Sequence, residues 1–200
     1  MDKKILVLAS NNTKKIEEIN ILLKDFNIEV KGLKDLGLGE PIEDGKTFAE
    51  NALIKAKYAF ENTGFPALAD DYGFCINSMN NFPGSCSARF IKAVGGEEKA
   101  FEVINSCINQ KDKSCFFITN LAFVYKTNNQ IIEKIFEGKV NGNFVFPARG
   151  NGGFGFDPVF IPNNYEKTFA EMLEIKIQIS HRTKSLNNFL NFVKINKIFE

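Results

Sequence analysis

The sequence is poor in the side chains from which proteins build zinc sites. It has a single histidine, His181, and its four cysteines, Cys75, Cys86, Cys107 and Cys115, show no C-x-x-C spacing. We therefore expect no zinc site. Reduced thiols in a cytoplasmic protein are the simplest interpretation of these cysteines.

Net charge and long apolar runs are also scarce. The 200-residue chain has a formal net charge of +1, which argues against a dedicated nucleic-acid groove but is compatible with a local basic pocket. The sequence contains no run of about 18 apolar residues, so it predicts no membrane span. The N-terminal MDKKILVLAS does not predict a signal peptide. We therefore expect a cytoplasmic protein without nucleic-acid or membrane partners, folded as a single domain over residues 1–200.

The apolar pattern predicts strands mixed with helices, and thus an α/β fold with a mixed sheet. Continuous apolar runs predict short strands at 5–8 and 67–69, the second ending at Asp70-Asp71. Two β-rich runs, 115–125 and 130–137, predict a hairpin. Apolar residues at helical spacing predict helices over residues 16–26, 48–60, 100–108 and 186–193.

The first group of polar residues that points to chemistry is Ser10, Asn12, Lys15 and Glu18, which follows the first predicted strand. A strand that leads into a helix directs free backbone amides and the positive end of the helix dipole at one point, which suits phosphate. A plain helix cap with a solvated lysine has the same pattern, so the spacing leaves both interpretations open.

The second group is Glu43 with Asp70-Asp71. Adjacent carboxylates at the end of an apolar strand repel each other unless a cation compensates them, and Mg²⁺ near phosphates is held by one or two carboxylates plus water and substrate oxygens. A carboxylate in that position can also activate a water molecule. A simple turn before Gly73 is the alternative.

A glycine-rich stretch from Arg149 to Arg182 is the third candidate site. Its glycines allow the backbone to approach a ligand closely, Phe154 and Phe156 offer flat surfaces for a ring, and Lys176, His181 and Arg182 suit a phosphate or a polar base edge. Gly150, Gly152 and Gly155 fit G-x-G-x-x-G, but Asp157-Pro158 follows at once, which argues against the helix that a dinucleotide fingerprint requires. A glycine-rich surface turn is the alternative.

Six segments of the chain occur in the order known from one enzyme family. They are SNNTKKIEE, TFAENALIKA, ADDYGF, PGSCSARF, RGNGGFGFDPVF and TFAEM followed by a lysine and ISHR. With these segments, from about Ile5 to Leu186, the chain closely resembles the inosine/xanthosine triphosphate pyrophosphatases, which remove deaminated purine nucleotides from the nucleotide pool. FGFDP and SHR in this order are highly specific for that family.

The resemblance implies a two-lobed α/β fold, with an elongated mixed sheet flanked by helices and an active-site cleft between the lobes. It implies Mg²⁺-dependent hydrolysis of a purine nucleoside triphosphate (ITP, dITP or XTP) to the monophosphate and pyrophosphate, by a homodimer. Asp71 then resembles the catalytic base, and Glu43 with Asp71 the metal ligands. The residues that resemble substrate contacts are Ser10, Asn11, Asn12, Thr13, Lys14, Lys15, Tyr72, Phe154, Gly155, Phe156, Asp157, Lys176, His181 and Arg182.

Tyr72 is a departure from the family pattern, in which a small hydroxyl residue, serine or threonine, usually follows the paired aspartates. A tyrosine hydroxyl reaches several ångströms further, so we expect the ring to fill space and the local contact to be rebuilt or lost. Two other functions remain open at this point. One is a pyrophosphatase with another specificity, as in the Maf-like enzymes, and the other is a nucleotide-binding protein without catalysis.

Overall fold

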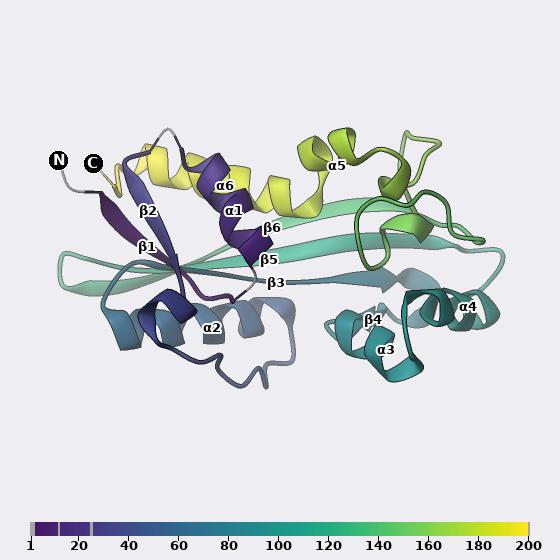
Figure 1. Ribbon diagram of the computed structural model, residues 1–200, viewed down its shortest axis with the longest axis horizontal. Coiled ribbons are helices and arrows are strands. Elements are labelled where there is room, and N and C mark those ends of the chain that lie inside the picture. The colour runs from purple at the N-terminus through teal and green to yellow at the C-terminus, as the bar shows by residue number, and fades with distance from the viewer. Residues whose placement is uncertain (1–2, 12, 25, 200) are drawn as a thin grey trace. The chain divides into compact units, whose positions relative to one another are not determined.

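The computed structural model describes residues 3–11, 13–24 and 26–199. Its strands form one seven-stranded mixed sheet in the order β2-β1-β3-β5-β6-β7, with β4 paired to β3 (Figure 1). The strands are β1 (Lys4–Leu8), β2 (Ile28–Gly32), β3 (Ala67–Ile76), β4 (Phe82–Gly84), β5 (Ser114–Thr127), β6 (Gln130–Phe144) and β7 (Phe160–Pro162). The α-helices are α1 (Thr13–Leu22), α2 (Phe48–Thr63), α3 (Ser87–Val94), α4 (Glu97–Cys107), α5 (Leu173–Ile179) and α6 (His181–Ile195). The predicted α/β class with a mixed sheet is confirmed.

The chain forms two compact units, which are described separately. The first comprises Met1–Asp71, Asn120–Phe136 and Leu186–Glu200. The second comprises Tyr72–Thr119 and Glu137–Ser185. One border between the units falls inside β3, between Asp71 and Tyr72.

In the first unit, β1 runs parallel to both β2 and β3, and each face of these strands packs on its own helices. Leu6, Leu8 and Leu68 pack in one buried cluster with residues of α1 and α6. Val7, Ala67 and Ala69 face the other side and pack on Ala52, Ala56 and Ala59 of α2. Figure 1 shows α2 on the opposite side of β1 and β3 from α1. Because side chains of a strand alternate between faces, Asp70 continues the row of Leu68 and Asp71 continues the row of Ala69.

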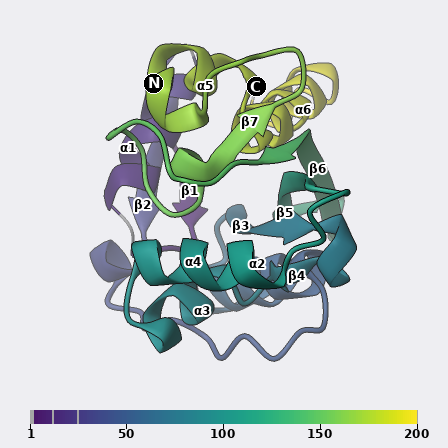
Figure 2. The same ribbon diagram turned by 90° about the vertical axis from the view of Figure 1, so that its right-hand side faces the viewer.

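The second unit is held together by aromatic rings. Phe74 of β3 stacks on Phe156 with ring centroids 4.7 Å apart, and Phe117 of β5 meets the edge of Phe160 at 4.8 Å. Figure 2 views the molecule from the end that carries α3 and α4 on one side of the strands and β7 on the other. This packing fixes the glycine-rich loop before β7 on the same core as the C-terminal half of β3.

Most of the long helices and strands were predicted from the sequence, but some of their predicted boundaries were wrong. The hairpin of β5 and β6 is confirmed, with Asn128 and Asn129 in the left-handed conformation at its turn. The strand expected to end at Asp70-Asp71 continues to Ile76, because Phe74 and Ile76 are buried on one face and pair with β4. The paired aspartates therefore lie inside a strand rather than at its end.

Gly138 of β6 allows a close approach between this strand and the start of α6. A Cβ at Gly138 would lie 1.9 Å from the carbonyl oxygen of His181 and 2.6 Å from the amide nitrogen of Ser185. Backbone atoms cannot yield as a flexible side chain can, so we expect Gly138→Ala to cost about 3 kcal/mol, at the upper end of overpacking effects. Thermal unfolding should show a loss of about 6–12 °C.

Gly39→Ala is the matched control for this substitution, because an added Cβ at Gly39 meets nothing within 4 Å and the residue has no positive φ. We expect its melting temperature to stay close to that of the wild type. An equally stable Gly138→Ala protein would contradict the close contact between β6 and the start of α6.

Candidate active site

Asp70 and Asp71 are separated by the alternation of β3, and each has its own lysine. Asp70 is buried and accepts a hydrogen bond from Lys15 Nζ of α1 at 2.7 Å. Asp71 faces α2, where Asn51 Nδ2 donates to Asp71 Oδ2 at 3.2 Å and Lys55 Nζ lies 3.9 Å from Asp71 Oδ1. The two carboxylates are therefore compensated by cations from two different helices.

Lys55 joins Asp71 to Glu43. Its ammonium group lies 3.0 Å from Glu43 Oε1, so two carboxylates that are far apart in the sequence converge on one cation. Asn51 and Lys55 are four residues apart and therefore share a face of α2. The loop that carries Glu43 comes close to this face at Gly45, where a Cβ would lie 2.6 Å from Asn51 Oδ1. Asn51 and Lys55 were not among the predicted site residues, although both lie in the TFAENALIKA segment.

The surroundings of Asp71 raise the pKa of its carboxyl group above the ordinary value. Burial is the largest cause, and the negative charges of Glu43 and Asp70 act in the same direction. The charge of Lys55 and the hydrogen bond from Asn51 lower the pKa and offset part of this effect. A carboxylate with a raised pKa is a stronger base, which suits a group that removes a proton from water.

The same residues fit a divalent cation. Glu43 and Asp71 offer hard oxygen ligands and already converge on a positive group, the ammonium of Lys55. In the part of the chain that the structure describes, no cluster of three or more histidine, cysteine, aspartate or glutamate side chains could hold a metal. Two carboxylates completed by water and substrate oxygens are the arrangement typical of Mg²⁺ beside phosphates.

The expected phosphate loop follows β1. Ser10 and Asn11 connect β1 to α1, and the amide of Ser10 donates to the carbonyl of Leu8 at 2.7 Å. Thr13, Lys14 and Lys15 form the first turn of α1, while Asn12 lies outside the described residues. The ammonium group of Lys15 contacts the carboxylate of Asp70. Phosphate binding at this loop stays a prediction.

The glycine-rich loop of the second unit is organised by the carboxylate of Asp157. Asp157 is buried, and its Oδ2 accepts from the amide of Phe154 at 2.9 Å and from Lys176 Nζ at 2.5 Å. Gly153 has a φ of +75°, and a Cβ there would collide with this carboxylate. A short 3-10 helix, Asp157–Val159, follows the loop instead of an α-helix. The rejection of a dinucleotide fingerprint is thus confirmed.

The two phenylalanines of this loop differ in exposure. Phe154 is 49% exposed, and Lys176 Nζ lies 4.6 Å from the centre of its ring. Phe156 is 2% exposed and stacks on Phe74 in the core. The expectation that both rings offer a surface to a ligand is therefore wrong for Phe156, whose ring is taken up by core packing. Phe154 alone of the two presents its ring.

Glu97 also holds the glycine-rich loop in place, although it was not among the site residues predicted from the sequence. Its carboxylate, in the first turn of α4, accepts a hydrogen bond from the backbone amide of Gly155 at 2.7 Å. Gly155 adjoins Phe154, so this bond ties the exposed ring to a helix 58 residues away in the sequence. A charged acceptor for a backbone amide carries no local sequence pattern, which explains why it was missed.

If Phe154 stacks on the base of a nucleotide, loss of this tether should weaken substrate binding. We expect Glu97→Ala to raise KM for ITP by roughly fivefold and to change kcat little, because one hydrogen bond to a charged group has been lost. The neighbouring Glu98→Ala is the control, since Glu98 is also exposed. Steady-state kinetics check the prediction, and an unchanged KM in Glu97→Ala would contradict the positioning role.

Tyr72, His181 and Arg182 lie together in the second unit. His181 is 6% exposed and stacks on Phe117, with centroids 4.8 Å apart and an angle of 8° between the rings. The ring of Tyr72 lies 6.0 Å from the imidazole, and the guanidinium carbon of Arg182 lies 5.0 Å from the centre of the Tyr72 ring. Three predicted substrate contacts are thus brought side by side.

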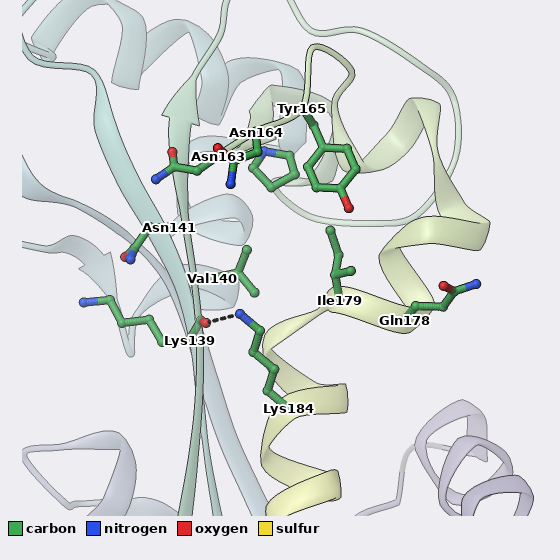
Figure 3. Close-up of a pocket in the computed structure, with 10 residues that line it drawn as sticks. Lys139, Val140, Asn141, Asn163, Asn164, Tyr165, Gln178, Ile179 and Lys184 are labelled. Carbon is green, nitrogen blue, oxygen red and sulfur yellow. Dashed lines mark hydrogen bonds between the residues drawn. The ribbon is translucent and has the colours of Figure 1, made fainter.

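A pocket of about 390 Å³ lies elsewhere in the second unit (Figure 3). It is lined by Lys139, Val140, Asn141, Pro162, Asn163, Asn164, Tyr165, Gln178, Ile179 and Lys184. Figure 3 shows the ammonium group of Lys184 directed at the backbone of β6, where it donates to the carbonyl of Lys139 at 3.0 Å. None of the predicted site residues lines this pocket, and its polar side chains are largely exposed.

Comparison with known proteins gives one consistent family. A model of the Ham1 family matches residues 6–192. A protein of Zymomonas mobilis named dITP/XTP pyrophosphatase is 40% identical over 190 residues, which cover 92% of this chain and 90% of that protein. The structure of a Ham1 protein from Coxiella burnetii matches with a TM-score of 0.87 and 32% identity, over 96% of this chain and 98% of that one. The Staphylococcus aureus Ham1 protein matches with a TM-score of 0.86 and 31% identity, over 96% and 100%.

Proposed function

The chain belongs to the Ham1 family, and on this basis we propose that it hydrolyses deaminated purine nucleoside triphosphates, namely ITP, dITP and XTP, to the monophosphate and pyrophosphate. The observation that carries the proposal is the surroundings of Asp71, a partly buried carboxylate held by Asn51 and Lys55 beside Glu43. A carboxylate in such surroundings suits both requirements of this hydrolysis, a base for the attacking water and a ligand for Mg²⁺.

In the proposed reaction, Asp71 orients a water molecule and takes its proton. The water oxygen forms a bond to phosphorus, the phosphoanhydride bond between the α and β phosphoryl groups breaks, and pyrophosphate leaves. The raised pKa of Asp71 supports this role, because a stronger base removes the proton more readily. Asn51 keeps Asp71 in place through its hydrogen bond.

Glu43 and Asp71 would hold a Mg²⁺ ion. When bound, the ion neutralises the negative charge of the triphosphate, which is the dominant requirement in phosphoryl transfer. Lys55, which lies between the two carboxylates in this structure, would then be free to meet a phosphate oxygen. Lys15 and the backbone amides at the start of α1 would bind the phosphates from the other face of β3.

The purine would be recognised by stacking and by hydrogen bonds to its edge. Phe154 offers an exposed ring, and stacking treats all purines alike. Selectivity therefore requires N–H donors that meet the 6-keto oxygen of the base, and we assign these to His181, Arg182 or nearby backbone amides. Adenine has an amino group at that position and offers no acceptor to such donors.

Two wider properties follow from family membership. We infer a homodimer, which sedimentation velocity on the purified protein would check. We also infer action in the cytoplasm, which the free state of all four cysteines supports, because a reducing compartment keeps thiols unpaired. No helix of the described residues is long and apolar enough to cross a membrane.

Release of pyrophosphate and IMP from ITP in the presence of Mg²⁺ tests the proposal. One pyrophosphate per IMP is expected. Phosphate release without pyrophosphate would indicate a different phosphatase reaction, and tight ITP binding without any product would favour a nucleotide-binding protein.

A further inference from the structure

Tyr72 of β3 lies beside His181 and Arg182 in the second unit. It directly follows Asp71, and the alternation of the strand turns its ring to the face opposite to that of Asp71. The strand therefore directs the hydroxyl group of Tyr72 away from the Asp71 carboxylate.

The ring of Tyr72 contacts both groups assigned to the base edge. Its centroid is 6.0 Å from that of His181, with an angle of 35° between the rings, and 5.0 Å from the guanidinium carbon of Arg182. A guanidinium group within about 6 Å of a ring face is attracted by the ring quadrupole. His181 also lies parallel to Phe117 at 4.8 Å, so its imidazole contacts two aromatic rings.

These contacts reduce the entropy cost of recognising a base with an arginine side chain. The arginine side chain has many rotamers, and ordering them on binding lowers affinity. A guanidinium group already held against a ring presents its donors in one orientation before the nucleotide arrives. Donors fixed in this way also reject a base that offers no acceptor more strongly than mobile ones, because they cannot turn away from it.

We propose that Tyr72 is a specificity-determining positioning residue, whose aromatic ring holds Arg182 and His181 in the orientation that recognises a 6-keto purine. The proposal rests on the proposed function. It assigns the role to the ring and not to the hydroxyl group. A serine or threonine at this position has no ring with which to hold the guanidinium group.

Three substitutions at Tyr72 distinguish the contribution of the aromatic ring from that of the hydroxyl group. Tyr72→Phe keeps the ring, and its kcat/KM for ITP should stay within about threefold of the wild type. Tyr72→Leu and Tyr72→Ser remove it. For both we expect kcat/KM for ITP to fall about tenfold, mainly through KM, while kcat/KM for ATP changes less than about twofold, so that the ITP/ATP ratio falls. Tyr165→Leu, an exposed tyrosine away from these residues, is the control for the loss of a ring.

Proton NMR gives a second readout that does not depend on activity. His181 is the only histidine of the chain, so its imidazole resonances need no assignment. In Tyr72→Leu these resonances should move, because a neighbouring ring current is lost, whereas in Tyr72→Phe they should stay close to their wild-type positions. A general loss of structure would broaden resonances throughout the spectrum instead.

Several results would overturn the proposal. Equal losses on ITP and ATP in Tyr72→Leu, or unmoved His181 resonances, would show that the ring does not hold the recognition groups. A loss of about 100-fold in Tyr72→Phe would transfer the role to the hydroxyl group. A wild-type protein that releases no pyrophosphate from ITP would instead remove the proposed function, whereas an active wild type with an unchanged ITP/ATP ratio in Tyr72→Leu would remove only the role of Tyr72.

Discussion

Asp71→Asn should give a folded protein that hydrolyses ITP about 10²–10⁴-fold more slowly than the wild type, which is the usual contribution of a positioned general base. The amide has nearly the same shape as the carboxylate, but it cannot take the proton of the attacking water. It also removes one of the two negative groups that converge on Lys55. If Asp71 holds the metal as well, the loss should exceed this range.

Asp112→Asn is the control for this substitution, because Asp112 is a half-buried aspartate just before β5 that accepts hydrogen bonds from Ser114 and has no expected role in the site. Its turnover should equal that of the wild type. A folded Asp71→Asn protein with near wild-type turnover would remove Asp71 from the catalytic role, and Glu43 would then be the next carboxylate to test.

The pKa shift of Asp71 also predicts the pH dependence. The base form is needed for catalysis, so activity should fall as the pH drops through the pKa of Asp71, which is raised in the metal-free protein and which bound Mg²⁺ would lower. The folding stability should depend on pH in the opposite direction to the activity. A carboxyl group whose pKa is raised on folding binds its proton more tightly in the folded state than in the unfolded state. Its ionisation therefore lowers the free energy of unfolding as the pH rises through the raised pKa. Asp71→Asn should therefore be at least as stable as the wild type at pH 7 without Mg²⁺.

Much of the fold could be predicted because its long elements have clear apolar periods. α2 begins at Phe48 after the N-cap Thr47, which forms a capping box with Glu50, and the sequence predicted a helix from residue 48. α5 shows why the rest could not be predicted. Its sequence LEIKIQI alternates apolar and polar residues as a strand does, yet it forms a helix on which Leu173, Ile175 and Ile177 are exposed. Local pattern and structure disagree there.

The parts of the site that depend on a single residue type or a local motif could be predicted. The parts that depend on a contact between residues far apart in the sequence could not. Asp71, Glu43 and the glycine-rich loop stood out as residue types. The partners of these residues did not: Lys55 bridges Glu43 and Asp71, and Glu97 holds Gly155. Such contacts join residues 12 or more positions apart and depend on the packing of a whole helix. The burial of Phe156 was equally invisible, because Phe154 and Phe156 are identical side chains two residues apart.

The second large effect concerns the choice of nucleotide. A pocket that only stacked a purine on Phe154 would treat ATP and ITP alike. Donors aimed at a 6-keto group are left without an acceptor when ATP binds, and sites built around such a hydrogen bond reject the wrong group by about 10⁴-fold. GTP has the 6-keto group too, so its exclusion must come from its 2-amino group, whereas XTP, with a 2-keto group, need not be excluded. His181→Ala and Arg182→Ala should each lower activity on ITP more than on ATP.

Steady-state kinetics of the wild-type protein on ITP, XTP, GTP, ATP and a pyrimidine triphosphate test the central claim most directly. We predict kcat/KM for ITP or XTP well above that for GTP, with ATP and the pyrimidine nucleotide lowest, and pyrophosphate as the product in every case. Equal efficiency on ATP and ITP would contradict the proposed function, even if pyrophosphate is released.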